Sequence, residues 1–223
     1  MVFATLGERL SAENMYQMAG KLGLSQTVGW QDESFLDGEE LHQIDQEEAG
    51  RILYNSSSIN GSVLAQTAIG QRDVLVTPLQ AANLIVTLLN HGVVYAPRLV
   101  SGIYYKDGST LAQFSVQKHV SKEGGIQPHN AKLLLSWMEK VVSNGTGRIL
   151  RSADWPLAGK SGTAQVIKNG KELNNQWFIG YGPVGNPKYA VAVLAQNRPL
   201  HSNHQAMQIF RSTMNILSST AGS

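Results

Sequence analysis

The last third of the chain holds three consecutive stretches typical of β-strands, joined by short turns. The stretches are Leu157–Lys168, Gln176–Gly182 and Tyr189–Gln196, with turns at Asn169-Gly170 and at Val184–Pro187. Connections this short join neighbouring antiparallel strands, so we expect a three-stranded antiparallel sheet. The third stretch is apolar on both of its faces, which predicts that both faces of the sheet are covered.

Two helices are predicted as the covering layers. The segment Asn203–Leu217 has apolar residues at steps of three or four, which indicates an amphipathic helix. Thr77-Pro78 marks another helix start, because threonine is a good N-cap and proline suits the first helical position. The run from Leu79 to Leu89 is apolar nearly all round, which predicts a central, buried helix. These elements predict an α+β fold, an antiparallel sheet flanked by helices, with residues 1–223 as a single domain.

The first two thirds of the chain carry further signals. We expect a helix over residues 2–10, a second helix capped by Ser11, strands at 98–105 and 110–116, and a helix from Pro128 to Asn144. Residues 25–62 are the acidic part of the chain and are rich in turn formers. They are predicted to form a solvated, loop-rich excursion with room for one short helix.

Composition excludes several classes of function. The chain has 223 residues, 42% of them hydrophobic, and a formal net charge of +2, with no basic cluster of the kind that binds nucleic acid. It has no cysteine, which excludes disulfides, zinc–thiolate sites and a cysteine nucleophile. No apolar run approaches the ~18–20 residues that span a bilayer. His201 and His204 have the spacing of a zinc pair, but without an evident third ligand they are interpreted as surface or capping residues. No metal or cofactor is expected.

Lys160-Ser161-Gly162-Thr163 lies in the first of the expected strands and combines groups suited to acyl transfer. Lys160 supplies a positive charge, and the two hydroxyls are suited to binding a substrate carboxylate. Gly162 has no side chain, so a substrate backbone can lie against it as an added strand. A backbone N–H at this edge can stabilise an oxyanion. Taken alone, such a tetrapeptide is more often part of an ordinary strand, although K-T-G is one of three motifs of serine acyl-transfer enzymes.

Several segments, in order, resemble the transpeptidase domain of class B penicillin-binding proteins. Their order and spacing across residues 2–217 make the resemblance specific, although no single segment is. The segments are Val2–Gly7, Ala68–Gln71, Val76–Gln80, Val141-Val142 with Gly145–Gly147, Ala158–Gln165 and Trp177–Tyr181.

The resemblance implies a serine-type D,D-transpeptidase that cross-links peptidoglycan stem peptides and is acylated by β-lactams. It implies that Lys160, Ser161, Gly162 and Thr163 bind substrate and that Lys160 and Thr163 are catalytic. Thr163 would give one oxyanion N–H, and its hydroxyl would bind the substrate carboxylate together with that of Ser161. It also implies a full-length protein tethered to the cell membrane on its extracytoplasmic face, within a cell-wall elongation or division complex.

The resemblance further implies a transpeptidase-like domain that is incomplete at its N-terminus. In the family, the S-x-x-K serine and the S-x-N motif precede the segment that Val2–Gly7 resembles. Ser115–Lys118 and Ser58–Asn60 fit these two patterns in reversed order, and we do not expect them to be catalytic. We expect that this chain alone is not acylated by penicillin. We also expect exposed apolar surface on the sheet face that the missing helix would cover.

Two departures from the family pattern are visible. Arg72-Asp73 stands where the family usually has a glycine, and Ser161 replaces the threonine of the motif.

Trp177 is expected in the core. A β-lactam sensor domain, or a non-catalytic structural or interaction domain on the same scaffold, stays open as an alternative.

Overall fold

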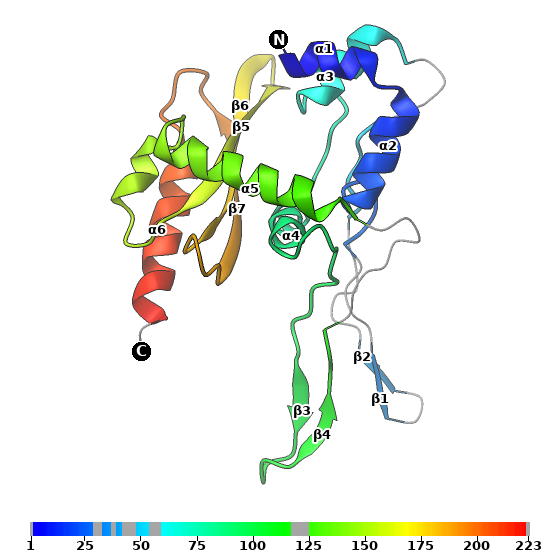
Figure 1. The fold of residues 1–223 in the computed structure, drawn as a ribbon, viewed down its shortest axis with the longest axis vertical. Coiled ribbons are helices and arrows are strands. Elements are labelled where there is room, and N and C mark those ends of the chain that lie inside the picture. The colour runs from blue at the N-terminus through cyan, green and yellow to red at the C-terminus, as the bar shows by residue number, and fades with distance from the viewer. Residues whose placement is uncertain are drawn as a thin grey trace.

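The structure is a computed structural model that describes residues 2–28, 48–53, 59–116 and 125–221, and the backbone alone of 33–36 and 39–41. The chain folds into helices and antiparallel strands, the α+β arrangement that the sequence predicts (Figure 1). The elements are α1 (Val2–Arg9), α2 (Ala12–Lys21), β1 (Glu33–Leu36), β2 (Glu39–Leu41), α3 (Gly61–Ala68), α4 (Pro78–Leu89), β3 (Gly102–Tyr104), β4 (Thr110–Gln113), α5 (Pro128–Ser143), the 3₁₀ helix η2 (Arg148–Ser152), β5 (Ala158–Lys168), β6 (Lys171–Gly182), β7 (Tyr189–Arg198) and α6 (Gln205–Thr220).

The central element is a three-stranded antiparallel sheet in the order β5-β6-β7. β5 and β6 pair in continuous register along the whole of β5. Asn169-Gly170 joins them, and both residues have positive φ, as the tight turn between twisted strands requires. β7 pairs with the other side of β6, with one irregularity between Asn174 and Gln176. β5 therefore lies at the edge of the sheet, and its outer side has no strand partner among the described residues.

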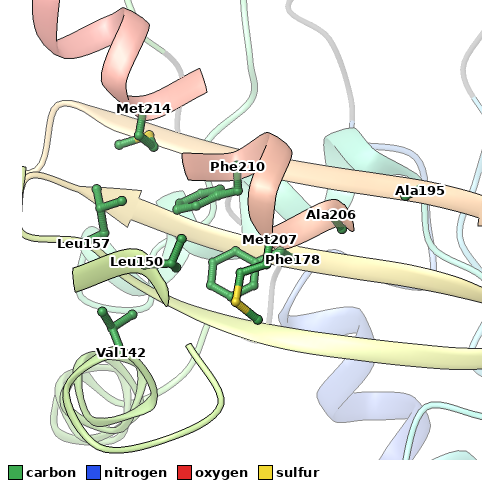
Figure 2. Close-up of a cluster of buried hydrophobic side chains, with 9 residues drawn as sticks. All are labelled: Val142, Leu150, Leu157, Phe178, Ala195, Ala206, Met207, Phe210 and Met214. Carbon is green, nitrogen blue, oxygen red and sulfur yellow. The ribbon is translucent and has the colours of Figure 1, made fainter. Parts of the chain in front are cut away.

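The helix α6 covers one face of this sheet (Figure 2). Phe178 of β6 and Phe210 of α6 are fully buried, and their ring centroids lie 4.7 Å apart. Gly180 permits this close approach, because a Cβ there would lie 2.9 Å from the Phe210 ring and 2.3 Å from a backbone oxygen of Ala158. The cluster is completed by Val142, Leu150, Leu157, Ala195, Ala206, Met207 and Met214.

The opposite face is covered by α4 and α5. Ile85 and Leu88 of α4 join Ala131 and Met138 of α5 in a second buried cluster, which also includes Tyr181 of β6. Helices thus lie on both faces of the sheet, as the apolar character of the third strand predicts, although on this second face they cover only part of it. The predicted central helix is confirmed as α4, and Figure 1 shows it lying against α5.

Several boundaries differ from the sequence prediction. The strands expected at 98–105 and 110–116 are confined to β3 and β4, a separate hairpin that extends below α4 in Figure 1 and pairs through only a few residues. α3 and η2 were not predicted, because each is a short element with little periodicity. Over the described part of the chain, no helix has the length and apolar character needed to cross a membrane.

Candidate active site

A groove of about 510 Å³ opens beside β5. It is lined by the three strands of the sheet, by α4 and by residues between positions 69 and 76. All four residues of Lys160-Ser161-Gly162-Thr163 line it. Trp177 lines it as well and is half-buried, so the prediction that Trp177 lies in the core is wrong. Its side chain lies in the groove that opens between the sheet and α4.

Strand register decides which motif side chains point toward the groove. Lys160 pairs with Ile179, and Gly162 pairs with Trp177. Ile179 and Trp177 both line the groove, so Lys160 and Gly162 lie on its side of the sheet. A Cβ on Gly162 would lie 3.3 Å from the Trp177 Cβ, so even a small side chain would crowd this position.

Ser161 and Thr163 lie on the other side of β5. They pair with Phe178 and Gln176, which are buried under α6. Because β5 is an edge strand, both hydroxyl residues remain accessible, Ser161 partly and Thr163 more fully. Ser161 Oγ lies 3.1 Å from Thr146 Oγ1, which links the motif to the loop after α5.

Backbone groups of Ser161 and Thr163, which alternate along the strand, face the outer edge of the sheet. The Thr163 carbonyl accepts a hydrogen bond from Gln71 Nε2 at 3.0 Å. The N–H and C=O of one residue in a strand point to the same side, so the Thr163 N–H is directed to this edge too. Lys160 Nζ donates to the Ser161 carbonyl at 2.5 Å, which keeps the ammonium group close to the same edge.

The lining of the groove is positively charged. Its described residues include the cations Lys160 and Arg72 and no aspartate or glutamate. Arg72 is paired with Asp73 at 3.1 Å, which leaves Lys160 as the stronger source of positive potential. A groove with this charge favours an anionic ligand such as a carboxylate.

The N-terminus of α6 lies against β6, the strand that pairs with the motif strand β5. Gln176, the partner of Thr163, is only 3% exposed, and its Oε1 accepts from the Gln205 N–H at 2.7 Å. His204 is the N-cap of α6, and its Nδ1 accepts from the Met207 N–H at 3.4 Å. The interpretation of His204 as a capping residue is therefore confirmed.

Ionisation of His204 depends on the motif. Burial lowers the pKa of His204 below its ordinary value, the Gly162 backbone opposes that shift, and the charge of Lys160 lowers the pKa further. The net direction is downward, so His204 is neutral at neutral pH. With Nδ1 acting as acceptor in the helix cap, the ring proton resides on Nε2.

The residues that fit the two missing motifs are not brought to the groove. Ser115 follows β4 and lines a separate pocket next to the projecting hairpin. Asn60 caps α3 by accepting from the Val63 N–H at 3.0 Å. Lys118 and Ser58 lie outside the described residues. Across the parts of the chain that are described, no cluster of three or more His, Asp or Glu residues could hold a metal ion.

Two residues of the groove edge were not singled out from the sequence. Gln71 and Thr146 each contact the motif, from positions 92 and 15 residues away in the chain. Both belong to segments that carry the family resemblance, which was the available signal. Their contacts depend on tertiary structure, which a single sequence does not reveal.

The chain is similar to known proteins over nearly its full length. Residues 1–215 match the family model described as the penicillin binding protein transpeptidase domain. Stage V sporulation protein D of Bacillus subtilis is 31% identical over 87% of this chain, and the peptidoglycan D,D-transpeptidase MrdA of Haemophilus influenzae is 29% identical over 82%. These matches span 28% and 31% of the two relatives, so the chain corresponds to less than a third of each.

Solved structures show the same fold. Penicillin-binding protein 2B of Streptococcus pneumoniae superposes with a TM-score of 0.76 at 25% identity, over 93% of this chain and 32% of that protein chain. Penicillin-binding protein A of Mycobacterium tuberculosis, solved as a ceftriaxone acyl-enzyme complex, superposes with a TM-score of 0.72 at 24% identity, over 96% and 44%.

Proposed function

Because this chain belongs to the transpeptidase-domain family of class B penicillin-binding proteins, we propose that it forms the strand side of a D,D-transpeptidase active site. In the whole protein this site would cross-link peptidoglycan stem peptides by serine acyl transfer. The observation that carries the proposal is the position of Lys160-Ser161-Gly162-Thr163 on an edge strand that borders a positively charged groove.

Each motif residue has a role that its geometry supports. The outer edge of β5 can pair with an extended peptide, and Gly162 leaves room for the peptide beside Trp177. The Thr163 N–H, directed to that edge, would stabilise the oxyanion of the tetrahedral intermediate. The hydroxyls of Ser161 and Thr163 lie on the α6 side of β5 but are accessible at its outer edge, where they would bind the substrate carboxylate. Lys160 would attract that carboxylate and raise the local positive potential next to the reacting serine.

The reacting serine would come from outside the residues that line this groove. An acyl-transfer site needs a nucleophile next to a base, and the serine of the motif instead contacts the Thr146 hydroxyl. We therefore expect that this chain alone gains no mass when it is incubated with a labelled penicillin. The isolated chain would act as the binding and oxyanion half of the site.

Ligand, location and partners follow from the same proposal. The β-lactam acyl-enzyme structures of penicillin-binding protein A support β-lactams as covalent ligands of the whole protein. Peptidoglycan lies outside the cytoplasm, so the site would work on the extracytoplasmic face of the cell membrane. Its macromolecular partners would be those of cell-wall elongation or division.

A chimera tests this proposal. The matched region of the Haemophilus influenzae transpeptidase MrdA is replaced by residues 1–215 of this chain, and acylation is followed with fluorescent penicillin. We expect the chimera to be labelled. Lys160→Ala should lower the labelling rate roughly 10²-fold, because one electrostatic contact to the reacting group is lost. Lys168→Ala, an exposed lysine at the far end of the same strand, serves as the matched control and should have no effect.

Two outcomes would contradict the proposal. One is a chimera that is folded but is not labelled, where folding is shown by cooperative unfolding at the same temperature as the parent enzyme. The other is equal labelling of the chimera and its Lys160→Ala variant. A labelled chimera that forms the acyl-enzyme but cross-links no peptide would instead support a β-lactam sensor.

A further inference from the structure

His204 has one ring nitrogen that the helix cap does not use. Nδ1 accepts from the Met207 N–H, so the proton lies on Nε2. This Nε2 is buried, and among the described residues it completes no hydrogen bond. A buried donor without an acceptor is unfavourable, so an acceptor for Nε2–H is expected close to the ring.

The surroundings of His204 include β6 and the motif strand β5. The bond from the Gln205 N–H to Gln176 fixes the start of α6 beside the direct partner of Thr163. His204 precedes Gln205 and lies close enough to Gly162 and Lys160 for both to act on its ionisation. Lys160 is the one charged group, among the described residues, that does so.

We propose that His204 is a positioning residue for the motif strand, with Nε2–H directed at the backbone of Gly162. It would hold the Gly162-Thr163 edge in place while a substrate strand pairs along it. This inference rests on the proposed function, because it concerns the same edge. Hydrogen bonds that are open in an unliganded site commonly tighten when the ligand binds. In histidine the acceptor that caps the helix, Nδ1, and the donor, Nε2–H, lie on different sides of one rigid ring, so one side chain can contact the helix end and the strand together.

A pH titration of the full chain by ¹⁵N–¹H NMR tests the proposal. The amide signals of Gly162 and Thr163 should shift together with the His204 ring, with a midpoint below 6.5, the ordinary histidine value. Asparagine can cap a helix but has no ionisable ring. His204→Asn should therefore keep the thermal transition and lose both amide shifts. His201→Asn, at an exposed position in the same segment, should leave both shifts unchanged.

The same variants have a functional readout in the MrdA chimera. His204→Asn should lower the acylation rate roughly tenfold, because the reacting edge is less well positioned, whereas His201→Asn should not. The proposal would be overturned if the amide chemical shifts of Gly162 and Thr163 stayed constant while the His204 ring titrates. It would also be overturned if these amide shifts still changed with pH in His204→Asn. If His204→Asn does not fold, the wild-type titration decides. An unlabelled chimera would count against the proposed function and leave the NMR result on the chain itself valid.

Discussion

Arg72 adopts a left-handed backbone conformation, with φ of 63°. This is the position where the resembled family usually has glycine, and a non-glycine residue in this region is strained by about 1 kcal/mol or more. Arg72→Gly should therefore raise the free energy of unfolding by about 0.5–1 kcal/mol, measured by urea denaturation. Loss of the ion pair with Asp73 should cost little, because both side chains are substantially exposed. Asn169→Gly is the control: Asn169 also has positive φ, but asparagine tolerates it, so a smaller gain is expected. A less stable Arg72→Gly variant would contradict this reasoning.

Single residues also show how far the sequence predicts the site. The chemistry of Lys160-Ser161-Gly162-Thr163 is readable from residue types, and the structure places all four at a groove. Their roles in catalysis stay predictions. The placement of both hydroxyl residues on the α6 side depends on strand register, and the contact of Gln71 with Thr163 spans 92 residues. Neither can be derived from local sequence, because both are products of how distant elements pack.

Among the secondary-structure elements, α4 has the best-defined start. Thr77 Oγ1 accepts from the Gln80 N–H at 3.1 Å, and Gln80 Oε1 accepts from the Thr77 N–H at 2.9 Å. This capping box satisfies two backbone donors that would otherwise have no hydrogen-bond partner within the helix. Thr77→Ala should lower the unfolding free energy by about 1 kcal/mol, which corresponds to about 2–4 °C in Tm by calorimetry. Thr77→Ser keeps the hydroxyl and should stay near the wild-type Tm. Equal Tm values for the alanine and serine variants would show that the cap does not contribute.

Elements with strong local signals are those that the sequence predicts well. The Thr77-Pro78 start, the Ser11 cap and the Asn169-Gly170 turn each rest on local backbone chemistry, and each is confirmed. Elements that depend on tertiary contact are predicted poorly. α3 has few residues and little periodicity, and the partly buried Trp177 sits in a strand whose pattern is typical of the core. A strand pattern shows that a residue is apolar, but it does not show whether a helix or a groove lies above it.

At the level of the whole molecule, the two sheet faces are covered unequally. Beneath α6 the cover is continuous, and the fully buried Phe178 and Phe210 lie there. On the other face, α4 and α5 cover part of the sheet, and the groove occupies the rest beside β5. The four motif residues and the uncovered apolar surface therefore line the same groove.

The groove should be detectable in solution as apolar surface. Leu75 lines it and is 54% exposed, and Trp177 and Leu194 line it from the sheet. Hydrophobic dyes such as ANS bind exposed apolar surface of this kind, so the native chain should enhance ANS fluorescence. Leu75→Glu should reduce that enhancement, because it places a charge in the apolar part of the groove. Leu99→Glu is the matched control, since Leu99 is 66% exposed but is not among the residues that line the groove. Equal fluorescence for the two variants, with unchanged circular dichroism, would mean that the dye binds elsewhere and that the groove is not the main apolar surface of the chain.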